Sequence, residues 1–340
     1  MKILVTGSTG FMGYWIAKEL VQREHEVFGF DDMSGGTNMA PHRFQKIDIR
    51  NVAEVRDAVS KIKPDILVHL AANAREGASA FQPYEVTTRN STGYAAVLES
   101  CLQYGLKKVV MFSSMAVYGE QPTPFDETLL RKPVDVYGGN KALMEETTEL
   151  LSEVYGYKYL IFRPHNVFGE FQSLKDKYRN VIGIFMNRLM RKEPLYIYGD
   201  GEQKRAFSYV LNSLPCYIRA IEDDSLKNQI INIGGMKEYT VNEIARLVMK
   251  YMGMEAELVY LAERPGEVKN AWCTYAKSVE QLGYNETYSV EEGIRRMAGW
   301  ALKQGPQDWT TEELTLMNDK VPLTWRPGFK GVAPEPLARS

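Results

Sequence analysis

The chain has 340 residues, enough to bury a large core, and this length indicates two compact lobes or one large α/β domain with an appendage. Its 41 Lys and Arg against 43 Asp and Glu give a net charge of −2, which excludes a global electrostatic attraction to nucleic acid or to an anionic membrane. The three cysteines, Cys101, Cys216 and Cys273, are widely spaced and odd in number, which argues against a disulfide framework or a structural zinc site.

The first residues, MKILVTG, enter a strand pattern at once, and no apolar run of the chain approaches the ~18 residues of a membrane span. We therefore expect no signal peptide, no membrane contact and no nucleic-acid partner. A reducing cytoplasm is the expected location.

The first 165 residues alternate short apolar runs with longer amphipathic stretches. The runs are KILVT, EVFGF, RFQKI, DILVHL, KVVMFSS and KYLIFRP. Runs rich in β-branched residues with helical segments between them are typical of parallel strands joined by crossover helices. This pattern predicts an α/β fold with a Rossmann-type doubly wound parallel sheet over residues 1–165.

After Arg163 the expected elements are shorter. We expect a helix at 180–191, strands at 194–199, 205–210 and 229–235, and a helix from about 241, whose start has Thr240 and Glu243 at capping-box spacing. These elements predict a smaller α/β substrate-binding lobe over 166–304, packed at the carboxyl ends of the strands. The proline-rich remainder, 305–340, is expected to be a C-terminal extension that either wraps the protein or is mobile.

A glycine-rich turn, TGSTGFMG, follows the first strand and opens the first helix, with Gly7, Gly10 and Gly13 in a GxxGxxG series. Glycines there permit a tight turn, while the helix N-terminus offers N–H groups to a pyrophosphate. The motif alone is weak, but FGFDDM places Asp31 at the end of the second strand. A carboxylate there accepts from ribose hydroxyls and repels a 2′-phosphate, so these features predict NAD rather than NADP.

The stretch VDVYGGNKALMEE places Tyr137 and Lys141 about one helical turn apart. A tyrosine acting as general base near neutrality needs its pKa lowered by roughly three units, or about 4 kcal/mol. A nearby ammonium, helped by a positively charged nicotinamide, favours such a shift. The alternative is an ordinary pair on a helix surface, because YxxxK is common by chance. FSSMAVYG supports the catalytic interpretation, since its Ser113 and Ser114 end the fifth strand at the edge where an α/β ligand lies.

Taken together, these motifs make residues 1 to 300 resemble an extended short-chain dehydrogenase/reductase of the nucleotide-sugar epimerase/dehydratase family. The resemblance implies that Ser114, Tyr137 and Lys141 are the catalytic residues, the last two also contacting NAD. The remaining NAD-binding residues that it implies are Gly7, Gly10, Phe11, Met12, Gly13, Asp31, Asp32, Asp48, Ile49, Leu70, Ala71, Ala72 and Asn90. The residues that it implies for the nucleotide sugar are Ser114, Met115, Asn166, Asn180, Val181, Tyr196, Ile197, Arg205, Arg264 and Ala271.

Arg205 and Arg264 also suit this site on chemical grounds, because guanidinium forks match diphosphate oxygens. Taken singly, either arginine is more often part of a surface ion pair. His69 and His165 follow strand patterns and are expected to be core or supporting residues. No carboxylate or histidine has metal-ligand spacing, so no metal is expected.

The residues after Ser114 favour some reactions of this family over others. The family's 4,6-dehydratases and uronate decarboxylases typically carry a glutamate two residues after the catalytic Ser or Thr, where this chain has Ala116 preceded by Met115. The resemblance therefore favours a 4-epimerase that works through a transient 4-keto sugar on a UDP-hexose or UDP-N-acetylhexosamine, and Asn166 favours a neutral sugar. A C4-dehydrogenase or 4-ketoreductase, a dehydratase, and a catalytically silent NAD- or sugar-nucleotide-binding regulator remain as alternatives.

Two further expectations follow from the resemblance. A homodimer is expected to form through helices near 84–104 and 137–155, whose apolar residues Ala95, Leu98, Leu143 and Leu150 must divide between core and interface. Ala271, by alignment on Lys277, is expected either to leave space for an N-acetyl group at the sugar C2 or merely to pack in the core.

The chain also departs from its relatives. Ala206, Leu211 and Asn212 stand where many of them carry acidic residues. Gly138 and Gly139 lie in the first turn of the catalytic helix, where each glycine costs roughly 1 kcal/mol of helix stability.

Overall fold

The computed structural model describes residues 1–36, 38–40, 42–264, 268, 270–310, 314–329 and 331. Its larger lobe is built on a parallel sheet with the strand order β11-β6-β5-β4-β1-β2-β3. The strands are β1 (Lys2–Thr6), β2 (Glu26–Asp31), β3 (Arg43–Lys46), β4 (Ile66–His69), β5 (Lys108–Phe112), β6 (Lys158–Pro164) and β11 (Gln229–Ile233). The expected α/β fold is confirmed, and the strand order reverses between β1 and β4.

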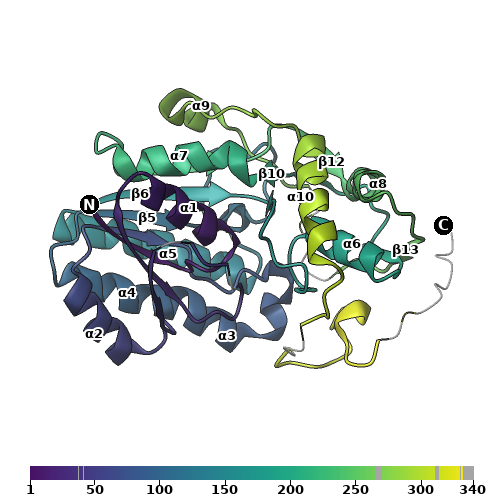
Figure 1. Cartoon of the computed structure of the whole chain (residues 1–340), viewed down its shortest axis with the longest axis horizontal. Helices are drawn as coiled ribbons and strands as arrows, with labels where there is room; N and C mark the ends of the chain where they lie inside the picture. The colour runs from purple at the N-terminus through teal and green to yellow at the C-terminus, as the bar shows by residue number, and fades with distance from the viewer. Residues whose placement is uncertain are drawn as a thin grey trace.

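Helices cover both faces of this sheet (Figure 1). One face carries α1 (Phe11–Gln22), α7 (Val210–Glu222) and α9 (Ala276–Leu282), and the other carries α2 (Val52–Ile62), α4 (Gly93–Leu102) and α5 (Val136–Tyr155). The short helix α3 (Pro83–Thr87) runs through a π-helical turn, Thr88–Thr92, directly into α4, so the helix expected at 84–104 is present with a π segment inside it. The strands β1, β2, β4 and β5 are buried on both faces, which explains their continuous apolar runs, whereas the edge strand β3 is mostly exposed.

The smaller lobe contains α6 (Val181–Met190), α8 (Val241–Met252) and α10 (Val290–Gln304) around one apolar cluster. Its strands pair as β7 (Val167–Phe168) with β10 (Ser208–Tyr209), β8 (Leu195–Tyr198) with β13 (Leu258–Leu261), and β9 (Lys204–Ala206) with β12 (Glu238–Thr240). The capping box of α8 is present, since Thr240 Oγ1 accepts from Glu243 N at 3.1 Å and the Glu243 carboxylate accepts from Thr240 N at 2.7 Å.

Two expected strands differ from the structure. The strand expected at 205–210 is divided into β9 and β10, which have different partners. The strand expected at 229–235 belongs to the large sheet, where β11 pairs with β6, rather than to the smaller lobe. The chain thus returns to the first lobe after building part of the second, and a division into 1–165, 166–304 and 305–340 stays a prediction.

The described part of the C-terminal extension packs against the rest of the protein. Leu314, Val321 and Trp325 are buried in a cluster with Ala78, Phe81 and Tyr178, and a short 3₁₀ helix, η4 (Leu323–Trp325), lies within it. Of the two expectations for this extension, wrapping is the one that these residues show. Within the described ranges, no helix combines the length and apolar character needed to cross a membrane.

Candidate active site

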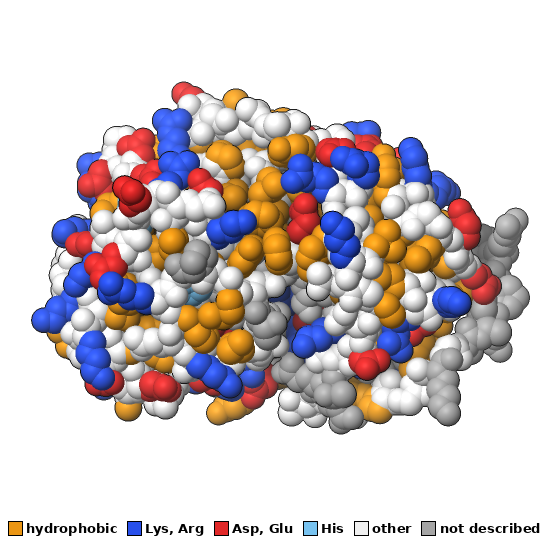
Figure 2. Space-filling view, viewed as in Figure 1, with side chains coloured by type: hydrophobic (Ala, Val, Ile, Leu, Met, Phe, Trp, Pro, Cys, Tyr) orange, Lys and Arg blue, Asp and Glu red, His pale blue; other side chains and the backbone are white. Residues whose placement is uncertain are grey.

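A cleft of about 920 Å³ opens beside the carboxyl ends of the sheet strands, where the order reverses between β1 and β4. Figure 2 shows the surface hollowed between the two lobes, with Lys and Arg side chains around the hollow. Every residue that the sequence implied for catalysis, NAD or the nucleotide sugar lines this cleft, with the exception of Asn90.

Asn90 is fully buried behind the cleft wall. Its Oδ1 accepts from Asn73 N at 2.7 Å, and its Nδ2 donates to Asn73 O at 3.2 Å. Asn73 itself lines the cleft. Asn90 thus holds the backbone of Asn73, and a direct contact of Asn90 with NAD stays a prediction.

The glycine turn has the geometry of a phosphate cradle. Gly7 has a φ of +73°, and a methyl group on it would lie 2.8 Å from Ala71 N, while a methyl group on Gly13 would lie 2.0 Å from Gly7 O. No larger residue fits at either position. Helix α1 begins after Gly10 without a side-chain cap, so its first N–H groups are available to an anion.

Asp31 is held in place by backbone donors. Its Oδ2 accepts from Thr9 N at 3.0 Å and its Oδ1 from Met33 N at 2.7 Å, and each oxygen keeps capacity for a ribose hydroxyl. Burial raises the pKa of Asp31. The neighbouring Asp32 pairs with Arg89 at 2.9 Å, and Asp48 pairs with Arg50 at 2.6 Å, whose hydrogen bond lowers the pKa of Asp48. The cradle and Asp31 together fit the pyrophosphate and adenosine ribose of NAD.

Ser114, Tyr137 and Lys141 come together at the inner end of the cleft. Ser114 begins the 3₁₀ helix η3 (Met115–Tyr118), and its Oγ accepts from Ala116 N at 3.1 Å. Tyr137 lies in the first turn of α5, which is capped by Asp135 through a 2.8 Å bond from Gly138 N. The Nζ of Lys141 donates to Phe112 O at 2.7 Å and is 5.8 Å from the centre of the Tyr137 ring.

The residues around Tyr137 do not by themselves lower the pKa of its phenol. Burial raises the pKa of the Tyr137 phenol, the charge of Glu76 raises it further, and a hydrogen bond with Ser114 acts in the opposite direction. Burial also lowers the pKa of Lys141 to about 8, against the effect of Glu145. The lowering that general-base catalysis requires stays a prediction for the NAD-bound protein, in which the nicotinamide would add its positive charge to that of Lys141.

The two glycines at the start of α5, Gly138 and Gly139, have different surroundings that explain their presence. A methyl group on Gly138 would lie 2.6 Å from Ala116 O, so only glycine lets α5 approach η3 this closely. Gly139 faces open space and lines the cleft. The close packing of Gly138 brings Tyr137 beside Ser114.

The predicted substrate residues lie on the opposite wall. Asn180 caps α6 by accepting from Ile182 N at 3.0 Å, and the Nδ2 of Asn166 donates to Ala206 O at 2.9 Å. Arg205 donates to Lys204 O at 2.9 Å and also to Val268 O, whereas the Arg264 guanidinium lies 5.0 Å from the centre of the Tyr198 ring. Both arginines line the cleft, and both asparagines shape its backbone.

The two expectations for Ala271, space for an N-acetyl group or packing in the core, both stay predictions. Ala271 lines the cleft, but it is only 3% exposed and packs with a cluster that includes Val117 and Phe125.

The two histidines are supporting residues, as expected: His69 Nδ1 lies 2.9 Å from Thr6 Oγ1, and His165 Nε2 lies 2.7 Å from the Tyr275 hydroxyl. Burial lowers the pKa of each to about 3, so both rings are neutral.

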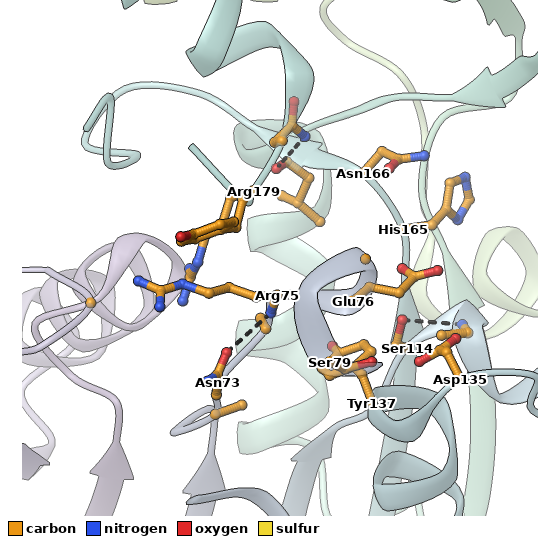
Figure 3. A pocket seen from close by; sticks show the side chains of 18 of the residues that line it. Asn73, Arg75, Glu76, Ser79, Ser114, Asp135, Tyr137, His165, Asn166 and Arg179 are labelled. Atoms are coloured by element: carbon orange, nitrogen blue, oxygen red, sulfur yellow. Dashed lines mark hydrogen bonds between the residues drawn. The ribbon is translucent and has the colours of Figure 1, made fainter. Parts of the chain in front are cut away.

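Sequence reasoning missed several charged residues that line the cleft (Figure 3). Glu76 and Asp135 point toward the region of Ser114, whereas Arg75 and Arg179 extend away from it. Arg75 Nε lies 3.0 Å and Arg179 Nε 3.3 Å from the same Asp176 carboxylate oxygen. Arg75 and Glu76 closely follow β4, and that position at the carboxyl end of a strand was a signal that could have found them.

The chain is similar in sequence and fold to known proteins over most of its length. The model of the NAD dependent epimerase/dehydratase family matches residues 3–234. A protein described as a putative UDP-glucose 4-epimerase from Methanocaldococcus jannaschii is 33% identical, with 88% of this chain and 97% of that relative covered.

Two solved structures are also similar. The UDP-glucose 4-epimerase of Thermotoga maritima with UDP-glucose has 31% identity and a TM-score of 0.85, covering 89% of this chain and 99% of that one. The UDP-glucuronic acid 4-epimerase of Bacillus cereus, in complex with UDP-glucuronic acid and NAD, has 27% identity and a TM-score of 0.81, covering 89% of this chain and all of that one. About a tenth of this chain thus lies beyond what these structures match.

Proposed function

The chain belongs to the NAD dependent epimerase/dehydratase family, and from that premise we propose that it is a nucleotide-sugar 4-epimerase. One observation carries this proposal: a single cleft brings the glycine cradle and Asp31 together with Ser114, Tyr137 and Lys141. The similarity to epimerases of UDP-sugars supports a UDP-hexose or UDP-N-acetylhexosamine as substrate.

In the proposed reaction, Tyr137 takes the proton of the sugar O4 hydroxyl and later returns it, while Ser114 holds the same oxygen by a hydrogen bond. Lys141 contributes positive charge over the Tyr137 ring, 5.8 Å from its centre. The glycine cradle and Asp31 would hold NAD, which would supply reversible hydride transfer at the sugar C4 and so permit a transient 4-keto sugar. Because the cofactor is regenerated within one turnover, it need not leave.

The substrate would lie with its diphosphate toward Arg205 and Arg264, whose guanidinium groups suit phosphate oxygens. Asn180 and Val181 at the start of α6, with Tyr196 and Ile197 on β8, would surround the nucleotide. Glu76 and Asp135 point toward Ser114, so a sugar carboxylate placed there would be repelled. This supports a neutral sugar over a uronate.

Dehydration of the sugar is the second candidate reaction, because Glu76 and Asp135 provide two carboxyl groups near Ser114. Our argument against it was that Met115 and Ala116 provide no acid or base after Ser114. Glu76 and Asp135 bring such groups from η1 (Glu76–Phe81) and from the loop before α5, as Figure 3 shows. Elimination would require one of them to act on the sugar ring or on its C6 hydroxyl.

The proposal includes a homodimer formed through α4 and α5. Helix α5 exposes Leu143, Leu150 and Val154 on one stripe, whereas Leu98 of α4 is fully buried and belongs to the core. We also propose a cytoplasmic location, because the three cysteines are buried free thiols, as is usual in a reducing compartment.

The test is to incubate the protein with UDP-, GDP-, dTDP- and CDP-sugars and to identify the products by NMR and mass spectrometry. An epimer of unchanged mass, formed without added NAD, is the expected result. A product that has lost water would establish the dehydratase. Turnover that requires added NAD or NADH would instead establish a dehydrogenase or ketoreductase.

A further inference from the structure

Residues 314–329, here called the strap, form part of the wall of the cleft. Pro322, Thr324 and Trp325 line it. The strap is bonded to both lobes: Leu316 N donates to Phe81 O at 2.8 Å, and the hydroxyls of Thr324 and Tyr198 share a hydrogen bond of 2.7 Å. In Figure 1 this yellow segment lies at the bottom of the view, below α10 and α6 of the smaller lobe.

Trp325 is the central residue of the strap. It is 4% exposed, and its ring contacts the rings of Tyr178, at 5.3 Å between centres, and Phe81, at 6.4 Å. A methyl group on Gly77 would lie 3.2 Å from the Trp325 ring, so the indole rests directly on the backbone of η1. The indole is therefore fixed by contacts from both lobes of the protein.

Arg264 makes cation–π contacts with two aromatic rings, one of which belongs to the strap. Its guanidinium carbon is 5.0 Å from the centre of the Tyr198 ring and 5.7 Å from that of Trp325. Cation–π contacts of this kind orient a guanidinium and limit its motion. An arginine that is ordered before its ligand arrives loses less conformational entropy on binding.

We propose that Trp325 is a positioning residue of the nucleotide-sugar site, which acts by holding Arg264 in place for the substrate diphosphate. This inference rests on the proposed function, since it takes the anionic ligand to be a nucleoside diphosphate. Phe329 of the strap lies 5.3 Å from the ring of Tyr196, where the nucleotide is placed. The strap thus completes the nucleotide end of the cleft with residues from the C-terminal extension.

The first test compares Trp325→Leu with Trp325→Phe. Leucine fills apolar space but has no aromatic face, whereas phenylalanine keeps one. By calorimetry, Trp325→Leu should bind UDP about 10-fold more weakly than wild type, and Trp325→Phe should stay within about 3-fold. In turnover, Trp325→Leu should raise KM with little change in kcat, and bound NAD should be unchanged.

Trp300→Leu is the matched control, because Trp300 is a partly buried tryptophan of α10 that contacts Phe171 and does not line the cleft. It should bind UDP as wild type does. Thermal unfolding shows whether each variant is folded at the assay temperature, and Trp325→Met replaces Trp325→Leu if the latter is not.

The second test is a double-mutant cycle with Arg264→Ala. If Trp325 acts through Arg264, adding Trp325→Leu to Arg264→Ala should weaken UDP binding by less than about 2-fold further. Uridine, which has no diphosphate, should bind to Trp325→Leu and wild type equally well. A full 10-fold further loss in the Arg264→Ala background, or an equal loss for uridine, would overturn the inference.

The failures of the two proposals are distinguishable. A wild type that binds UDP but forms no epimer refutes the proposed reaction and leaves the role of Trp325 in place. Equal UDP binding by wild type and Trp325→Leu refutes the role of Trp325, whatever the turnover. A wild type that binds none of UDP, GDP, dTDP and CDP overturns both.

Discussion

Tyr137 shows how the chemistry of one residue depends on neighbours from distant parts of the chain. It lies on α5, Ser114 follows β5, and Glu76 follows β4. Burial and Glu76 oppose its ionisation, so its activity as a base depends on the charges that surround it once the cofactor is bound.

Tyr137→Phe should lower turnover by at least ~100-fold, the scale of general-base catalysis, while fold and bound NAD are retained. Tyr118→Phe is the matched control, since Tyr118 is a buried tyrosine that donates to Asn232 at 2.7 Å and does not line the cleft. Turnover, unfolding temperature and NAD content should be measured for both. If Tyr137→Phe keeps most of its activity, Tyr137 is not the base.

Lys141 should leave a signature in the pH dependence of stability. Its pKa falls from 10.5 to about 8 on burial, so between these values the unfolded chain binds more protons than the folded one. The stability of NAD-free wild type relative to Lys141→Met should therefore rise with pH across this window, by about 3 kcal/mol in total. Denaturant unfolding between pH 7 and 11 measures it. A difference that stays constant with pH would contradict the assignment.

Ala271→Tyr should lower activity on sugars with an acetamido group more than on sugars without one. If Ala271 leaves space for an acetamido group, tyrosine should lower kcat/KM for UDP-N-acetylglucosamine at least ~10-fold more than for UDP-glucose. Because Ala271 also packs in a core cluster, the larger ring should destabilise the protein by about 1–3 kcal/mol. The ratio of the two kcat/KM values separates these effects, and equal losses on both substrates would leave only the packing role.

At the scale of elements, the capped helix α8 allows a direct test. Thr240→Ala removes the hydroxyl that accepts from Glu243 N, which should lower stability by about 1 kcal/mol. Ser60→Ala on α2 is the control, because the Ser60 hydroxyl donates to the Asp57 carbonyl within an exposed helical turn. Equal unfolding midpoints for Thr240→Ala and wild type would show that the cap contributes nothing.

Most helices and strands could be predicted from the sequence, because hydrophobic periodicity and composition depend only on residues that are neighbours in the chain. All six apolar runs of the first 165 residues contain a strand, and α6 and α8 begin where their asparagine and threonine caps stand. The partner of a strand is not a local property. The run QIINIGG contains a strand, but nothing in it shows that β11 pairs with β6 in the large sheet.

The same limit explains which site residues were found. Gly7, Asp31 and Ser114 follow strands within recognisable motifs, so their place at one edge of the sheet could be inferred. Asp135 and Arg179 are charged residues in the segments just before α5 and α6, and such residues are usually solvated. Only the folded chain shows that they line the cleft.

At the scale of the whole molecule, α5 presents an apolar stripe to solvent. Leu143, Leu150 and Val154 are 51%, 63% and 73% exposed, at the spacing of one helix face. Such a stripe next to α4 is typical of a helix-bundle interface between two copies of a chain.

Leu150→Glu should therefore convert a dimer into a monomer, because two copies would each bring a charge into an apolar contact. Leu302→Glu, on α10, is the control, since Leu302 is also exposed, at 44%, but lies on another face of the molecule. Sedimentation at micromolar concentration should show a dimer for wild type and Leu302→Glu. A monomeric wild type would refute the interface.

The pairing of β11 with β6 affects how this protein folds while it is synthesised on the ribosome. Strand β6 is complete at Pro164, but its partner begins only at Gln229. At 5–20 residues per second, the nascent chain carries the unpaired edge of β6 for on the order of 3–13 s. An open strand edge is a template for pairing with other chains. Translation speed over this stretch, and chaperones that shield a growing chain, should therefore affect how much of the protein reaches its native form.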